Sequence, residues 1–157
     1  DSGSRYDKDG NLNNWWTDED LTQFETLGAA LADQYSAIEV LPDVTINGKF
    51  TLGENIGDLG GVLAAYDALQ LSFKDSSKPE NIDGFTAEQR FFMSWATVWR
   101  TKMRDDALKT RIKTDPHSPG MNRAVQPLLN VDAFYDAFNI KEGDKMYIAP
   151  EDRVRIW

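Results

Sequence analysis

Apolar side chains recur at intervals of three or four residues in the first quarter of the chain. The members of this series are Leu21, Phe24, Leu27, Leu31 and Tyr35. Such spacing places them on one face of an α-helix. Thr17 offers an N-cap just before the series, and Asp20 adds an acidic residue to the first turn. The pattern therefore predicts an amphipathic helix over about residues 18–38.

A second helix is predicted from Glu54 onwards, because apolar residues continue at helical spacing through Val62, Leu63, Tyr66 and Leu69. This region also contains four glycines, at positions 53, 57, 60 and 61. Each glycine lowers the stability of a helix by about 1 kcal/mol relative to alanine. We therefore expect this part of the helix to pack very closely against another segment.

The remainder of the chain predicts further helices. Thr86 and Gln89 form a capping-box pattern that opens a third helix, whose residues 91–99 are apolar nearly all round and are expected at the centre of a core. Shorter helices are predicted over residues 105–112, 122–129 and 131–138, and the last twenty residues are expected to be irregular. No strand signal is strong, so the predicted fold class is mainly α, with a single domain over residues 1–157.

Composition excludes several classes of function. The net charge of −9 argues against binding nucleic acid or an anionic membrane surface through bulk electrostatics. The absence of cysteine excludes disulfides and thiolate chemistry, and no apolar run approaches the roughly 20 residues that span a bilayer. The start Asp1-Ser2-Gly3-Ser4 has no initiator methionine or leader, so we expect a piece of a longer protein.

Two carboxylates in the second predicted helix are candidates for metal chemistry. Glu54 and Asp58 are four residues apart, so they lie on one helix face and suit a metal ligand backed by a second acid. A catalytic zinc ion usually takes three protein ligands and a water molecule. The chain has one histidine, His117, and no cysteine. Solvated helix charges and a hydrogen-bonded loop histidine are the alternative interpretations of these residues.

Residues 53–58, Gly-Glu-Asn-Ile-Gly-Asp, resemble the Gly-Glu-Asn-Ile-Ala-Asp signature of the neprilysin and endothelin-converting-enzyme family of zinc metalloendopeptidases, with Gly57 replacing alanine. Other matches follow in the family's order: Asp7–Gly10, Trp15–Trp16, Phe91–Trp99, Thr114–Gly120, Arg123 and Trp157. The resemblance covers nearly the whole chain. It implies the helical C-terminal portion of a thermolysin-like catalytic domain.

The resemblance implies a role for each matching residue. Glu54 corresponds to the third zinc ligand, and the first two come from a His-Glu-x-x-His helix expected to end just upstream of Asp1, which also supplies the general base. Asp58 is expected to hold the free N–H of a zinc-bound histidine and so to orient it. His117 corresponds to the histidine that stabilises the oxyanion formed when water attacks the peptide carbonyl.

The resemblance also assigns residues that bind substrate. Arg123 corresponds to the arginine that binds a substrate backbone carbonyl, and its planar fork can address a carbonyl and a supporting carboxylate together. Val98 and Trp99 match residues that line the pocket for the hydrophobic side chain after the scissile bond. The implied activity is cleavage of oligopeptides on the amino side of hydrophobic residues, with one Zn²⁺ per intact site.

Mammalian members of the family carry cysteines where this chain has none, so a bacterial protein is expected. We also expect an extracytoplasmic location, which is periplasmic, secreted or surface-anchored. The chain alone is expected to be inactive, to need the upstream half of the same polypeptide as its partner, and to self-associate through an apolar patch. The alternative is a non-catalytic peptide-binding or scaffold domain derived from such a peptidase.

Overall fold

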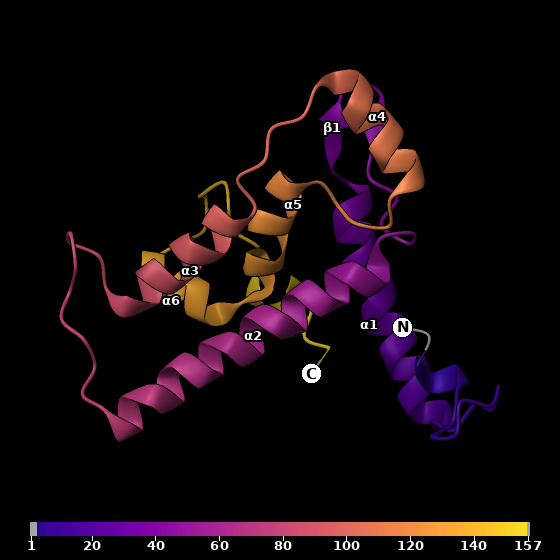
Figure 1. Cartoon of the computed structure of the whole chain (residues 1–157), viewed down its shortest axis with the longest axis horizontal. Helices are drawn as coiled ribbons and strands as arrows, with labels where there is room; N and C mark the ends of the chain where they lie inside the picture. Colours follow the sequence, from indigo (N-terminus) through magenta and orange to yellow (C-terminus); the bar gives the residue numbers. More distant parts are fainter. Residues whose placement is uncertain (1–2, 157) are drawn as a thin grey trace.

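Helices dominate the computed structural model, which describes residues 3–156 (Figure 1). The α-helices are α1 (Asp18–Ser36), α2 (Leu52–Asp75), α3 (Ala87–Val98), α4 (Asp105–Thr114), α5 (Gly120–Val125) and α6 (Asp132–Phe138). Three short 3₁₀ helices are η1 (Gly3–Arg5), η2 (Gln126–Asn130) and η3 (Pro150–Asp152). The predicted mainly α fold is confirmed, whereas the matches proposed for Asp1 and Trp157 lie outside the described residues.

The predicted helix starts are formed by the predicted caps. The Thr17 hydroxyl accepts the backbone N–H of Asp20 at 3.1 Å at the start of α1. At the start of α3, Thr86 accepts the N–H of Gln89 at 3.2 Å, and the Gln89 side chain accepts the N–H of Thr86 at 3.0 Å. These bonds satisfy backbone donors that lack partners within the helix, which is why both helices begin where the sequence predicted.

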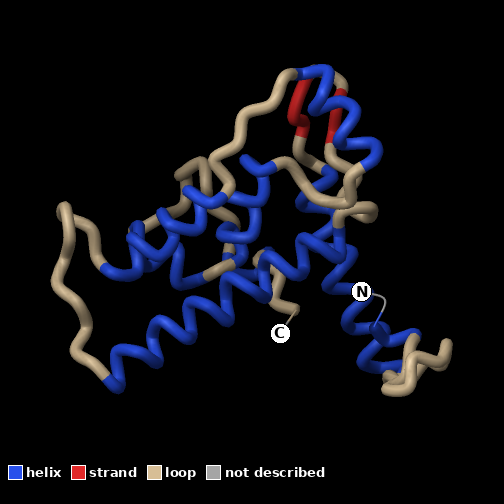
Figure 2. The backbone as a smooth tube through the Cα atoms, in the orientation of Figure 1, coloured by secondary structure: helices blue, strands red, loops and turns tan. Residues whose placement is uncertain are grey.

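A short β-hairpin was not anticipated from the sequence. Strands β1 (Glu39–Leu41) and β2 (Val44–Thr45) pair antiparallel next to α4 at the top of the molecule (Figure 2). Asp43 turns the chain with a positive φ of 61°, and its N–H donates to the Glu39 carboxylate at 2.8 Å. Strands of two or three residues are too short to produce an alternating pattern, so periodicity does not reveal them.

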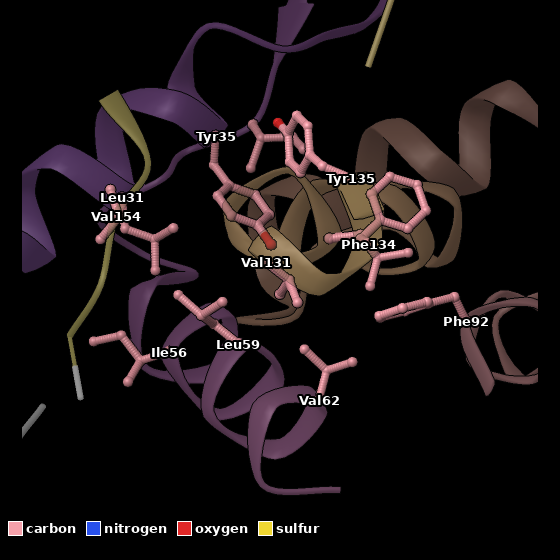
Figure 3. Packing of buried hydrophobic residues seen from close by; sticks show 12 residues of the cluster. Leu31, Tyr35, Ile56, Leu59, Val62, Phe92, Val131, Phe134, Tyr135 and Val154 are labelled. Carbon is pink, nitrogen blue, oxygen red and sulfur yellow. The ribbon is translucent and has the colours of Figure 1, made fainter. Parts of the chain in front are cut away.

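The hydrophobic core lies where the first half of α2 meets α1 and the C-terminal third of the chain (Figure 3). α1, α2 and α3 contribute Leu31, Tyr35, Ile56, Leu59, Val62 and Phe92, while the later segments contribute Leu128, Val131, Phe134, Tyr135 and Val154. The buried residues of α2 end at Val62, so only the first half of this helix is embedded. That half carries the candidate metal ligand. The core therefore holds the functional part of α2 rigidly.

The expectation that α3 is central in the core is wrong for the chain that the structure describes. Only Ala87 and Phe92 of this helix are buried, while Met93 is 41% and Val98 71% exposed. α3 packs against α2, α5 and α6 through the side that carries Phe92 (Figure 1). Its apolar residues on the other side have no covering segment in residues 3–156, which is why the nearly continuous apolar run does not correspond to complete burial.

The close packing expected around the α2 glycines is not found at Gly57 and Gly61. A side chain built at Gly57 or Gly61 would meet no other heavy atom within 4 Å. The close approaches occur elsewhere: a side chain at Gly48 would collide with Ala32 and Ser36 of α1, and one at Gly120 with Thr101 and Trp99. Glycine is thus required at position 48, where the loop meets α1, and at position 120, where α5 begins, and not at positions 57 and 61.

Candidate functional site

Helix α2 places the carboxylates of Glu54 and Asp58 on one face but in different surroundings. The Glu54 side chain is 44% exposed, whereas that of Asp58, one turn later, is 7% exposed. A half-exposed carboxylate remains accessible to a cation, but a buried one needs a permanent partner because an unpaired buried charge is costly. None of the helices in residues 3–156 is long and apolar enough to cross a membrane.

Arg123 is the partner of Asp58. Its Nε donates to one Asp58 oxygen at 2.7 Å and its Nη2 to the other at 2.7 Å, across 65 residues of sequence. This two-bond geometry is the strong form of the arginine–carboxylate pair. The hydrogen bonds that Arg123 donates to Asp58 raise the pKa of Arg123, helped by the charges of Asp58 and Glu54 and opposed by burial. The pair therefore favours the charged form of the guanidinium.

Two tryptophans also contact Arg123: Trp95 in α3 and Trp99, which directly follows this helix. The guanidinium carbon lies 4.0 Å from the centre of the Trp99 ring, a cation–π contact. The Trp95 indole N–H donates to the Arg123 backbone carbonyl at 3.1 Å. Trp99 therefore acts as a platform for the arginine in this structure, while Val98 is exposed at the end of α3. Their predicted role as a substrate pocket stays a prediction.

His117 lies between two carboxylates in the loop before α5. Its Nε2 is 3.0 Å from a Glu54 oxygen, and its Nδ1 is 2.6 Å from Asp115. The same Asp115 oxygen accepts the His117 backbone N–H at 2.9 Å, and Arg111 contacts the other Asp115 oxygen at 3.2 Å. The structure thus brings His117 onto Glu54, as a common site requires, although the two residues are far apart in sequence.

Asp115 and Arg111 were not singled out from the sequence. An aspartate two residues before His117, in a loop with two prolines, is a common turn signal, and that is the pattern that could have identified Asp115. The backbone and side-chain hydrogen bonds from His117 lower the pKa of Asp115 below its ordinary value of 3.8, and Arg111 adds to this shift. The stability that ionised Asp115 contributes to the fold is present at pH values above 3.8 and is lost as the pH falls through the lower pKa of the folded state.

The four charged residues form one continuous group. Glu54 contacts His117 at 3.0 Å and approaches Nη2 of Arg123 at 3.8 Å, and Arg123 in turn holds Asp58. A carboxylate oxygen with this exposure fits one position of a zinc site. Within residues 3–156, no group of three or more histidine, cysteine, aspartate or glutamate side chains is arranged to hold a metal ion. The described chain thus presents one half-exposed carboxylate with an imidazole and a guanidinium beside it.

Comparison with known proteins gives relatives along the whole chain. It is 38% identical to the neutral endopeptidase of Lactobacillus helveticus over 156 residues, which are 99% of this chain and 22% of that protein. It is 36% identical to neprilysin-11 of Caenorhabditis elegans, covering 100% of this chain and 19% of the relative. The chain thus spans about a fifth of the length of these relatives.

Solved structures agree with the relatives found by sequence. The inhibitor complex of the zinc metalloprotease ZMP1 of Mycobacterium tuberculosis superposes with a TM-score of 0.93 at 47% identity, covering 100% of this chain and 25% of that one. The structure of PepO from Lactobacillus rhamnosis gives a TM-score of 0.80 at 35% identity, covering 97% and 22%. The sequence profile of Peptidase family M13 matches residues 1–154, and the chain therefore belongs to Peptidase family M13.

Proposed function

We propose that this chain is the C-terminal part of the catalytic domain of a zinc endopeptidase that cleaves oligopeptides on the amino side of hydrophobic residues. The observation that supports this most is the group formed by Glu54, His117, Arg123 and Asp58 in a member of Peptidase family M13. The names of its relatives, neutral endopeptidase and zinc metalloprotease, point the same way. Two histidines from another part of the same polypeptide would complete the metal site.

Glu54 is the residue of this chain that would hold the zinc ion. A bound zinc ion supplies Lewis acidity, polarising a carbonyl and lowering the pKa of a bound water molecule. Glu54 contributes an accessible carboxylate on the rigid first half of α2. Asp58 lies one turn further along the same face, and its oxygens already accept two bonds from Arg123. Each oxygen retains acceptor capacity, so a histidine N–H could also reach Asp58.

His117 is the group proposed to stabilise the oxyanion of the tetrahedral intermediate. The imidazole ring lies between Glu54 and Asp115, and a ring N–H is the donor that it would offer to an oxyanion. Asp115 fixes the ring through Nδ1, which leaves Nε2 directed at the Glu54 side of the site. With Glu54 holding a zinc ion, the Nε2 N–H would be available to the substrate oxygen.

Arg123 is proposed to bind a backbone carbonyl of the substrate. Its pair with Asp58 uses Nε and Nη2, so Nη1 remains as the donor for a substrate. The Trp99 ring beneath the guanidinium keeps its plane fixed. This preorganisation lowers the entropic cost of binding the peptide. We also propose that Val98 and Trp99 border the pocket for the hydrophobic side chain, since Val98 is exposed and directly precedes Trp99, whose ring contacts this arginine.

The experiment that tests the proposal compares the 157-residue chain with the full-length protein. The full-length protein is expected to hold one zinc ion and to cleave a peptide before a hydrophobic residue in a chelator-sensitive reaction. The chain alone is expected to bind zinc weakly and to cleave nothing, because it supplies one carboxylate and one histidine outside a closed ligand set. Metal analysis after dialysis and mass spectrometry of the products are the measurements.

Two results would change this proposal. Stoichiometric, tightly held zinc with peptide cleavage by the chain alone would contradict the incomplete site. A full-length protein that binds peptides but hydrolyses none would favour the alternative, a scaffold domain derived from a peptidase.

The isolated chain is also proposed to self-associate. Several large apolar side chains are exposed on its surface, among them Leu71, Met93, Val98 and Met121. Contiguous apolar surface favours association because burial removes it from water. Sedimentation velocity at rising concentration is expected to show a growing dimer or larger fraction, and a single monomeric species throughout would refute this.

A further inference from the structure

A buried pair of polar side chains lies directly behind the exposed residues of the site. Asn55 follows Glu54 in sequence and Ser118 follows His117, and each side chain is only 1% exposed. The Ser118 hydroxyl donates to the Asn55 side-chain oxygen at 2.8 Å, across 63 residues of sequence. This bond therefore joins the same two segments that present the candidate metal ligand and the candidate oxyanion donor.

The pair is anchored further into α2. The Asn55 amide donates to the Thr51 hydroxyl at 2.9 Å, one turn earlier, and the Thr51 hydroxyl donates to the Asn47 carbonyl at 3.2 Å. Thr51 is itself buried. The series runs from the loop before α5 through the first turn of α2 to the turn after the hairpin. A buried polar series whose members are satisfied rigidifies its surroundings, since each partner is costly to leave unpaired.

The exposed contact between Glu54 and His117 is a weak constraint by comparison. Their side chains are 44% and 37% exposed, and partly exposed ion pairs contribute little because water screens them. A metal ion held by Glu54 would compete with His117 for the same carboxylate, whereas the neutral hydrogen bond between Ser118 and Asn55 involves neither of those groups. Pro116 and Pro119 restrict the loop on either side of the anchored Ser118, so His117 has little freedom to move.

We propose that Asn55 and Ser118 are positioning residues that set the distance between Glu54 and the His117 ring. Neither side chain touches the substrate side of the site. Their hydrogen bond determines how the His117 loop is placed against α2. The consequence for catalysis rests on the proposed function, whereas the effect on the His117 position does not.

The position of His117 can be measured without any activity. His117 is the only histidine of the chain, so the imidazole gives a single set of NMR signals. Substitution Glu54→Gln is expected to shift these signals, because the carboxylate lies 3.0 Å from Nε2. We then measure the shift of the His117 signals caused by Glu54→Gln in an Asn55→Ala or a Ser118→Ala background. We expect this shift to be smaller by at least about half, because Coulomb and hydrogen-bond effects weaken steeply as the ring moves away from Glu54.

A second long-range polar pair in the same chain, which makes no hydrogen bond to the site residues within residues 3–156, provides a matched control. Gln34 and Asn130 exchange two amide hydrogen bonds, at 3.0 and 2.8 Å, across 96 residues. Gln34→Ala removes a long-range polar pair of the same kind and is expected to leave the His117 response to Glu54→Gln unchanged. An undiminished response in both the Asn55→Ala and the Ser118→Ala background would overturn the proposal. Ser118→Ala removes only a hydroxyl, so it covers the case in which Asn55→Ala does not fold.

The catalytic consequence is tested in the full-length protein. Asn55→Ala and Ser118→Ala are expected to lower kcat by about 10- to 100-fold, as misplacement of a reacting group does, with KM within about twofold and zinc content unchanged. The double variant is expected to be no worse than the more impaired single one, because both substitutions remove the same hydrogen bond between Ser118 and Asn55. Ser118→Thr, which keeps the hydroxyl, is expected to recover activity, and Gln34→Ala to retain it.

The outcomes separate the two proposals. If the unsubstituted full-length protein hydrolyses no peptide, the proposed function fails and the NMR comparison still decides the positioning role. If it is active and both alanine variants keep full kcat, the catalytic part of the inference is overturned while the proposed function stands.

Discussion

Substitution Glu54→Gln in the full-length protein is expected to remove tightly bound zinc and to lower kcat/KM on the order of a thousandfold or more, because metal ions supply several kcal/mol of transition-state stabilisation. Glutamine keeps the size of the side chain but replaces an anionic ligand by a neutral amide. Glu54 is half exposed, so the loss of its charge does not leave a buried group unpaired. Zinc content after dialysis and the rate of peptide cleavage measure the effect.

Asp67→Asn is the matched control for this substitution. Asp67 is an exposed carboxylate on the same helix, beyond the last buried residue of α2, and its neutralisation is expected to leave zinc content and rate unchanged. A Glu54→Gln variant with full zinc content and native activity would exclude Glu54 as the metal ligand.

Substitution His117→Gln is expected to lower kcat by about 100- to 1,000-fold, which is the usual effect of removing one oxyanion donor. The zinc content is expected to stay at one per protein, because His117 is proposed to act on the substrate and not on the metal. KM is expected to change little, since the developing charge exists only in the transition state. Single-turnover kinetics on a peptide substrate, with metal analysis of the same samples, measure these quantities separately.

Asp115→Asn gives a graded comparison. It removes the anion 2.6 Å from Nδ1 while the imidazole remains, so its effect on kcat is expected to be smaller, about 10- to 100-fold, as for other residues that orient a functional histidine. If His117→Gln lost zinc along with activity, His117 would be a metal ligand and the proposed role would be wrong. If it kept full activity, the oxyanion role would be excluded.

The sequence predicted individual elements better than it predicted their surroundings. Helix starts at Thr17 and Thr86 are local, because each cap depends on residues within one turn, and both were found where expected. The burial of α3 depends on what covers each of its sides, which no local pattern contains, and its apolar run proved only partly buried. The β-hairpin was missed because each strand is shorter than the period that would reveal it.

The candidate site shows the same division. Glu54 and Asp58 share a helix face through their spacing alone, so their relation was predictable from the sequence. The bidentate bond between Arg123 and Asp58 was not, because the two residues are 65 positions apart and meet only when α5 is placed beside α2. Asp115 escaped notice for a different reason: an aspartate in a proline-containing loop has many ordinary uses.

By itself, the sequence determined the helical character of the chain, the spacing of the signature carboxylates and the resemblance that matches Peptidase family M13. These depend on neighbours within a few residues or on the order of motifs. Only the tertiary structure decided that Asp58 is buried against Arg123, that Glu54 remains accessible beside His117, and that Asn55 and Ser118 join the two segments beneath them. Pairing and burial depend on segments distant in sequence, and packing alone brings those segments together.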